Sequence, residues 1–468
     1  MLKKRLPLDC PSVTRKNRFW VFHAMMLLSM GRGYAQPAFG AVKPVVQPAV
    51  YEQDTLPASV WKPKWISKKE SFKLTIRSMV QLWSVYSIGF EVYNTTTKAY
   101  EAVDDRFNLS LRRAVLSFSG EPYPRLQYTV LFYYDQIGRD ILASGLGLPN
   151  KAEPGIGIRD AYFHWKALPK SEGLNFIAGW FRPQLQRESI TSAWSVNSME
   201  KSSSQSYFRS HLVGTGLGRS TGINIGGLIN FKKTGLLYNL GVFNPTTTGL
   251  NGSSVGNIFS PLLTGRVVVS LGDPEMEKYG IAYEINYFNR RKGISLDFNA
   301  AVQGKTEQFE SATTFGPGFL LNYGALNLDG EWIWMRRRGQ ETLPTQEIRA
   351  ISSRCETGHI RIGINLPAGR FLLEPTLMVM HFEGAHDALK QADALALHFS
   401  SGDETTYDIG VNCYLDQRNL KLMLHYIFRD GNPGDAGDGA TVNSYFFQSG
   451  VGAIRRGNWL GLGMNVVF

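Results

Sequence analysis

The C-terminal stretch Leu460-Gly-Leu-Gly-Met-Asn-Val-Val-Phe468 decides the fold class. Large apolar residues hold every second position and mostly small or polar residues stand between them, which is the pattern of a β-strand with one apolar face. An apolar strand that ends on an aromatic residue is typical of membrane β-barrels. We therefore expect Phe468 to act as a barrel assembly signal.

The same alternation recurs over most of the chain upstream. From Leu420, apolar side chains fall on one face and mostly polar or basic ones, with one methionine, on the other: Leu420, Leu422, Leu424, Tyr426 and Phe428 against Lys421, Met423, His425 and Arg429. Many such segments run for ten residues or more, against about five or six in ordinary strands and about nine to eleven in tilted membrane strands. Aromatic residues such as Trp332 and Trp334 gather at segment ends, as in an interfacial girdle.

These segments predict an all-β fold, a transmembrane antiparallel β-barrel of about 16 strands, with 18 possible, over residues 71–468. One expected hairpin pairs residues 281–287 with residues 294–298. A secreted soluble β-sandwich shows the same alternation with its apolar face turned inward. That fold remains the alternative.

The first seventy positions have a different character. Basic residues up to Arg18 precede an apolar run over 19–30, and small residues stand at Gly33 and Ala35, which predicts a signal peptide over 1–35. Residues 36–70 contain five prolines and little periodicity, so we expect a Pro-rich periplasmic linker. A signal peptide followed by a linker and then by barrel strands predicts an outer-membrane location in a Gram-negative bacterium.

Charge and cysteine content exclude several classes of function. The chain has 50 Lys and Arg against 39 Asp and Glu, but seven of these basic residues lie in the first 35 positions. The rest of the chain is only slightly basic and predicts no nucleic-acid partner. Cys355 and Cys413 offer no zinc spacing, so we expect no metal. Cys413 falls on the outward parity of its strand, and a bond to Cys355 would need adjacent strands, so we expect free thiols. We also expect no cofactor. The eight His residues form no metal-binding or catalytic motif, which favours a protein that is not an enzyme.

Two stretches carry a family resemblance. One is Phe107-Asn-Leu-Ser-Leu-Arg-Arg-Ala-Val-Leu-Ser-Phe-Ser-Gly120. The other is Gly179-Trp-Phe-Arg-Pro183, followed by Glu188, Thr191, Ser192 and Glu200-Lys201-Ser202. Both resemble strands and a loop of the phosphate-selective porin O and P family, and Gly241-Val-Phe-Asn-Pro245 is similar to another strand end of that family.

The resemblance implies a sixteen-stranded homotrimeric porin with a loop folded into the lumen. Residues 183–207 are the candidate for this loop, and an ordinary surface loop is the alternative. Departures from the family pattern are Arg182 directly beside Pro183 and Lys201 where the family usually has Arg.

Strand parity and the candidate loop supply the pore-lining residues. An anion pathway needs Arg and Lys, whose donors match phosphate and carboxylate oxygens. The candidates are Lys73, Arg77, Arg112, Arg125, Lys166, Arg182, Arg187, Lys421 and Arg429. The same parity turns the acids Asp135, Asp160, Glu284 and Asp297 inward. Arg336-Arg337-Arg338, beside Trp334, are expected to meet lipid phosphates or to attract anions at a pore mouth.

We therefore expect an outer-membrane porin that gives small hydrophilic solutes passive diffusion. Its expected partners are outer-membrane lipid and small anions, phosphate among them. A barrel that acts mainly as a surface binding protein, and a secreted glycan-binding β-sandwich, remain the alternatives.

Overall fold

The computed structural model describes residues 73–143, 156–212, 218–245, 256–432, 445–448 and 452–468. The expected signal peptide (1–35) and linker (36–70) lie outside these residues. Within the described ranges, no helix is long and apolar enough to cross a membrane.

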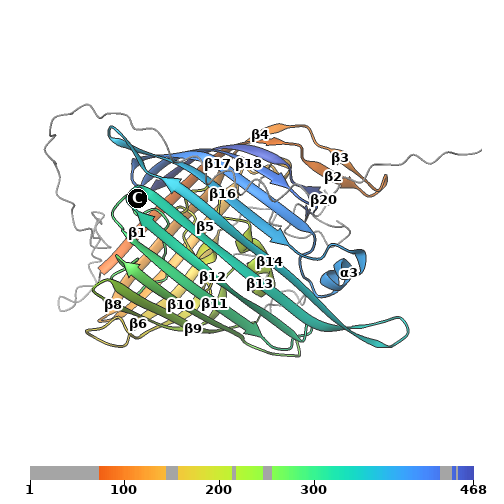
Figure 1. Cartoon of the computed structure of the whole chain (residues 1–468), viewed down its shortest axis with the longest axis horizontal. Helices are drawn as coiled ribbons and strands as arrows, with labels where there is room; N and C mark the ends of the chain where they lie inside the picture. The colour runs from red at the N-terminus through yellow and green to blue at the C-terminus, as the bar shows by residue number, and fades with distance from the viewer. Residues whose placement is uncertain (1–72, 144–155, 213–217, 246–255, 433–444, 449–451) are drawn as a thin grey trace, which may run out of the picture. The chain divides into compact units, whose positions relative to one another are not determined.

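Antiparallel strands form one closed barrel (Figure 1). In chain order they are β1 (Lys73–Ile88), β4 (Arg106–Tyr123), β5 (Leu126–Ile137), β6 (Gly157–Lys166), β7 (Asn175–Phe181), β8 (Ser220–Phe231), β9 (Thr234–Phe243), β10 (Leu262–Gly272), β11 (Gly293–Gln303), β12 (Ser311–Tyr323), β13 (Leu326–Thr342), β14 (Ile348–Ile364), β15 (Leu366–Ala368), β16 (Phe371–Glu383), β17 (Asp403–Asp416), β18 (Leu420–Asp430) and β21 (Asn458–Val467). Since β14 and β15 both pair with β16 and are separated only by Asn365, they form one wall strand. Pairing of β21 with β1 closes a sixteen-stranded barrel, as the sequence predicted.

The two ends of the barrel differ. Strand β1 begins and β21 ends at one end, here called the turn end, and α3 (Ala388–Ala396) lies at the other, the loop end (Figure 1). A small second sheet, in the order β19-β20-β2-β3, is built from insertions between β1 and β4 and between β18 and β21. Its strands are β2 (Glu91–Asn94), β3 (Ala99–Ala102), β19 (Tyr445–Gln448) and β20 (Gly452–Arg455).

The apolar side chains point out of the barrel. Leu460 and Leu462 on β21 are exposed, and Gly461 and Asn465 between and beyond them are buried. On β18, Leu422 and Leu424 are exposed while their neighbours Lys421, Met423 and His425 are buried. A soluble sandwich would bury the apolar set instead, so the closed barrel excludes that alternative.

The expected hairpin over 281–298 is wrong. Residues 294–298 belong to β11, which pairs with β10 and β12. Tyr283 and Ile285 are buried without belonging to a strand. Alternation alone does not distinguish a paired strand from an irregular segment whose every second side chain is buried.

Cys355 and Cys413 are free thiols, as expected. Cys355 is buried on the inward face of β14, and Cys413 is half-buried on the outward face of β17. Because β16 lies between these strands, the two sulfurs cannot meet in a disulfide.

Candidate functional site

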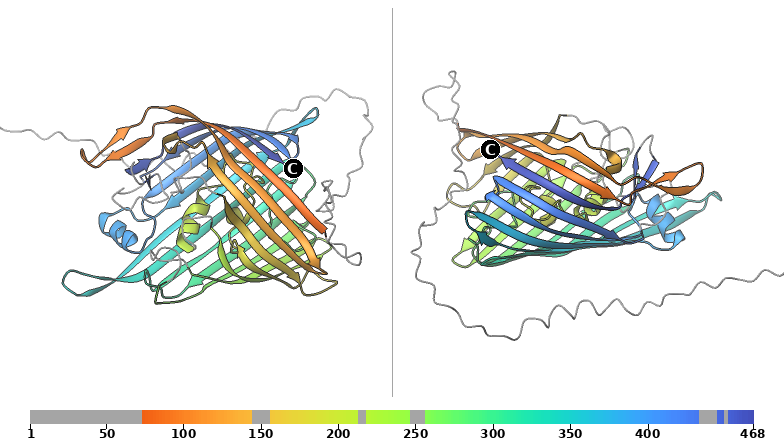
Figure 2. Two further views of the ribbon diagram at one scale, coloured as in Figure 1. Left: turned by 180° about the vertical axis from the view of Figure 1, so that it is seen from behind. Right: turned by 90° about the horizontal axis from the view of Figure 1, so that it is seen from above.

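The lumen is the candidate site, and two chain segments enter it from opposite ends. The loop-end segment, described over residues 182–212, follows β7 and contains α1 (Arg187–Ile190) and α2 (Ser204–Leu212). The turn-end segment, residues 273–292, joins β10 to β11. In the views of Figure 2 the yellow-green helices of the loop-end segment lie inside the ring of strands.

Three neighbouring wall strands, β16, β17 and β18, which are far from the loop-end segment in the sequence, hold this segment through hydrogen bonds. Lys421 Nζ donates to Val196 O over 2.9 Å, and Asn197 Nδ2 donates to Glu374 Oε1 over 3.0 Å. The backbone N–H of Met199 donates to Asp408 Oδ2 over 2.9 Å. These contacts confirm residues 183–207 as an inward-folded segment and exclude the ordinary surface loop.

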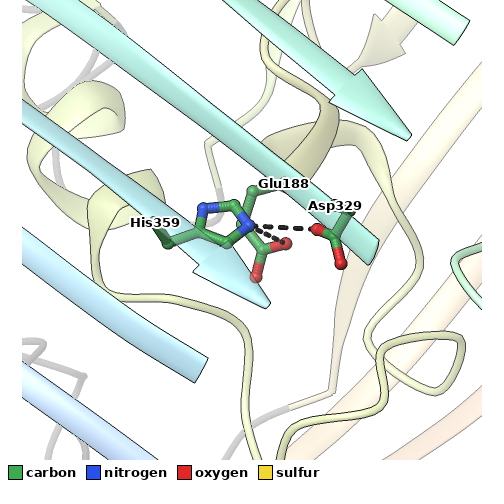
Figure 3. A group of neighbouring side chains, drawn as sticks. All are labelled: Glu188, Asp329 and His359. Atoms are coloured by element: carbon green, nitrogen blue, oxygen red, sulfur yellow. Dashed lines mark hydrogen bonds and ion pairs between the residues drawn. The ribbon is translucent and has the colours of Figure 1, made fainter. Parts of the chain in front are cut away.

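A buried charge network anchors α1 to the wall (Figure 3). Glu188 Oε2 accepts from Arg361 Nη2 over 2.7 Å, and His359 Nε2 lies 3.1 Å from Asp329 Oδ2. Glu188, Asp329 and His359 each offer a ligand atom within 4.8 Å of the others, which is compatible with a metal site. However, Arg361 Nη2 also lies 3.3 Å from His359 Nε2, so a guanidinium already supplies positive charge to this group. We interpret the group as an ion-pair network.

The turn-end segment meets the loop-end segment inside the barrel. Arg187 and Glu275 form a bidentate ion pair, Nη2 to Oε1 at 2.6 Å and Nη1 to Oε2 at 2.8 Å. Thr191 and Tyr283 form a parallel β-bridge beside it. Asn286 exchanges two side-chain hydrogen bonds with Asn365 of the wall, at 2.7 and 2.9 Å. The two segments therefore brace each other across the lumen.

The carboxylates of Glu188 and Glu275 both have a pKa below the ordinary value of a glutamate. Burial alone would raise the pKa of Glu188, but Arg361, His359 and Lys201 lower it to about 2. Burial would likewise raise the pKa of Glu275, and Arg187 lowers it to about 2. Because its pKa is lowered in the folded barrel, each ionised carboxylate stabilises the fold at pH values above 4.5, the ordinary pKa of a glutamate. This contribution is lost as the pH falls toward 2.

We therefore predict that acid destabilises the barrel only below about pH 5. The free energy of unfolding, measured by urea titration in detergent, should not decline from neutral pH to about pH 5 and should fall below that value. In Glu188→Gln, which already lacks the carboxylate, the fall should be smaller. A decline that begins above pH 6, or an equal decline in the variant, would contradict the ion-pair assignment.

A basic cavity of about 90 Å³ remains between α2 and the wall. Six basic and two acidic side chains line it: Arg112, Arg113, Lys201, Arg209, Arg429 and Arg456, with Glu200 and Asp408. Arg429 and Arg456 also pair with Glu404, each over 3.3 Å. The cavity therefore carries an excess of positive charge.

A β-bulge brings two consecutive arginines into this cavity. Gln81 of β1 stands opposite Arg113 while the next residue, Leu82, stands opposite Leu111, so Arg112 is one extra residue in β4. Both guanidinium groups reach Glu200, Arg112 Nη2 at 2.9 Å and Arg113 Nη2 at 2.7 Å. Burial would raise the pKa of Glu200, but Arg113 and Arg112 lower it to about 2. This trio has a net positive charge.

Five of the sequence candidates lie inside the barrel. Arg112 and Arg429 line the basic cavity. Lys421 and Arg187 hold the inner segments through the contacts above, and Arg182 Nη1 donates to Thr191 O over 3.1 Å.

The remaining candidates lie toward the turn end. Lys166, the last residue of β6, forms an ion pair with Glu172. Arg77 is exposed near the start of β1. Lys73 is the first residue of β1, and its side chain is outside the described part of the structure. Arg125 occupies the turn between β4 and β5 with φ +71°, so the strand parity that placed it inward does not apply.

The inward acids are matched by arginines. Asp297 lies 3.5 Å from Arg266, and Asp160 lies 3.1 Å from Arg219. Asp135 pairs with Arg159. Glu284, which parity placed on a strand, lies in the turn-end segment and pairs with Arg418.

Sequence reasoning missed several cavity residues. Arg113 was missed because strand parity places only one of two consecutive residues on the inward face, and the sequence gives no sign of the bulge. Arg209 lies in α2 and Arg456 lies between β20 and β21, so neither had a strand parity to follow. Glu200 and Lys201 did stand out, as part of the motif that carries the family resemblance.

Comparison with known proteins supports the fold. No model of a protein family matches the chain, and no curated protein matches its sequence. Among solved structures, the anion-selective porin from Comamonas acidovorans is 11% identical, with 85% of this chain and 100% of that chain covered and a TM-score of 0.50. The outer membrane channel DcaP of Acinetobacter baumannii is 13% identical, with coverages of 86% and 99% and a TM-score of 0.48. OmpF of Salmonella typhi, in complex with daunomycin, is 10% identical, with coverages of 85% and 98% and a TM-score of 0.49. The chain has the barrel fold seen in outer-membrane porins, and membership of the phosphate-selective porin O and P family stays a prediction.

Proposed function

We propose that this protein is an outer-membrane porin of a Gram-negative bacterium, through which small hydrophilic solutes diffuse passively with a preference for anions. The proposal includes a homotrimer, outer-membrane lipid as its surroundings and no cofactor. Phosphate is the anion that the family resemblance favours.

The basic cavity carries the proposal. A pore selects ions by its width and by the charges that line it. Here the loop-end segment narrows the lumen, and the cavity between α2 and the wall is lined by six basic and two acidic side chains. A guanidinium fork donates two parallel hydrogen bonds to a phosphate or carboxylate, so this lining favours such anions over cations.

Reconstitution in a planar bilayer tests the proposal. The purified full chain should insert in discrete steps of conductance that scale with salt concentration. Migration on a gel should shift on heating, from a trimer to an unfolded monomer. A barrel that inserts and carries no current would contradict the porin proposal and favour a surface binding protein.

We also propose Phe468 as the assembly signal. Its backbone N–H donates to Ser78 O over 2.9 Å and its carbonyl accepts from Ser78 N over 3.2 Å, while its side chain is 66% exposed. The ring therefore adds little to packing and remains open to an assembly machinery. Phe468→Ala should lower the amount of folded barrel in cell envelopes several-fold and leave refolding in detergent unchanged. An equal loss in both settings would show that Phe468 acts through stability.

A further inference from the structure

Three arginines on neighbouring strands point out of the barrel wall and are called here the outer arginine cluster. Alternating burial places Arg336 and Arg338 on the outward face of β13 and Arg354 on the outward face of β14. Arg336 stands directly opposite Arg354 in the strand pairing. Among barrel-strand residues with described side chains, no other arginine or lysine points outward.

The cluster lies at the loop-end edge of the apolar outer surface. Toward the turn end, the outward residues of both strands are apolar or glycine, apart from Glu356, which stands opposite Trp334: Leu326, Leu328, Gly330, Trp332 and Trp334 on β13, and Gly358, Ile360, Ile362 and Ile364 on β14. Indole rings concentrate where the apolar core of a bilayer meets its head groups. Since Arg336 is the next outward residue after Trp334, a barrel that spans a membrane holds this cluster at the level of the head groups.

Among the described residues, the cluster has no ion-pair partner. Like charges directly opposite each other destabilise a sheet, and Arg336 faces Arg354. Within the described part of the chain none of the three arginines forms an ion pair, and Arg336 Nε is buried without an acceptor. The nearby outward acid Glu356 accepts from Trp332 Nε1 over 3.4 Å instead.

Arg337 provides an internal comparison. It lies between Arg336 and Arg338 but points inward, where it donates to Leu397 O over 2.8 Å and to His211 O over 2.5 Å. The arginine that packs against protein thus donates to backbone carbonyls, whereas the described residues supply no such acceptor to the side chains of its two neighbours, which face the membrane side. The outward position and positive charge of Arg336 and Arg338 favour binding of an anionic ligand from outside the barrel.

We propose that the outer arginine cluster binds the phosphate groups of a lipid in the leaflet at the loop end. Guanidinium groups bind phosphate oxygens in a bidentate manner. Opposed residues lie about 5 Å apart across the strands and alternate residues about 7 Å apart along them. Three charges at these separations match a head group with two phosphates better than one with a single phosphate. The inference rests on the proposed membrane location.

Lipid binding by the full chain tests this inference. The barrel, refolded in a neutral detergent, is titrated with diphosphoryl lipid A, with its monophosphoryl form and with phosphatidylcholine, and bound lipid is counted by native mass spectrometry. The diphosphoryl lipid should bind most tightly. The triple variant Arg336→Gln, Arg338→Gln, Arg354→Gln should bind it about 100-fold more weakly.

Two controls separate the possible outcomes. Arg370→Gln removes an exposed arginine at the turn end and should leave lipid binding unchanged. Unchanged lipid binding by the triple variant, or displacement of the lipid by inorganic phosphate at equal concentration, would overturn the lipid site. The triple variant should conduct as the parent does, because the cluster lies outside the lumen. Failure to bind lipid in a conducting barrel therefore overturns this inference alone, and absence of conductance overturns the porin proposal.

Discussion

Glu275→Ala is expected to destabilise the barrel by about 3–5 kcal/mol, the usual cost of removing one partner of a buried ion pair. Arg187 and Glu275 are 1% and 6% exposed at their side chains. Among the described residues, the change leaves the guanidinium with only Asp297, 3.8 Å away, as an opposite charge. The same change removes the ion pair between the turn-end and loop-end segments. We expect a lower urea midpoint in detergent and larger, noisier conductance steps in a bilayer.

The double variant Arg187→Met, Glu275→Leu is the control for this prediction. Replacing both members of a buried pair by apolar residues of similar volume is often neutral for stability. The double variant should therefore recover most of the stability that Glu275→Ala loses. If both variants lose the same stability, the contribution of the pair is packing and the electrostatic explanation fails. If conductance is unchanged in Glu275→Ala, the two segments do not brace each other.

Exchange of both Arg112 and Arg113 for Gln is expected to lower the anion-to-cation permeability ratio roughly tenfold. A unit charge about 10 Å from an ion in water changes its free energy by about 0.4 kcal/mol, with opposite sign for anions and cations. Removal of two positive charges makes passage less favourable for anions and more favourable for cations. The sum of these changes corresponds to about a tenfold change in the permeability ratio. Glu200, left without its two partners, also makes the local charge negative.

Glu200→Gln provides a test of opposite sign. It leaves both arginines in place and removes the one carboxylate that they share, so the anion preference should rise. The two variants are compared by their zero-current potentials in the same salt gradient. A shift in the same direction for both would mean that the changes act through the shape of the cavity instead of its charge.

The wall of the barrel was predictable from the sequence because a strand has a side-chain period of two. That period turned Lys421 inward and Leu422 outward without any knowledge of their neighbours, and the structure confirms both. The inward-folded loop-end segment was found from a motif, since Glu188 and Glu200 stood at family-like spacing. Closure, strand number and apolar outer face followed from many such local patterns.

The interior was less predictable because it depends on contacts between residues far apart in the chain. Arg113 enters the cavity through a bulge in β4, which shifts parity by one residue and leaves no mark in the sequence. Tyr283 and Ile285 alternate like a strand, yet they lie in a segment that folds into the lumen. The ion pair between Arg187 and Glu275 joins the loop-end segment to the turn-end segment. No local sequence pattern predicts a contact between two segments that enter from opposite ends of the barrel.

The zero-current potential of the reconstituted barrel across a KCl gradient tests the central claim most directly. The basic cavity predicts a potential of the sign that anion flow produces, reduced by added phosphate and shifted toward cation flow when Arg112 and Arg113 are both Gln. A cation-selective potential in the parent, or one identical in parent and variant, would contradict the assignment of the basic cavity as the selective part of the pore.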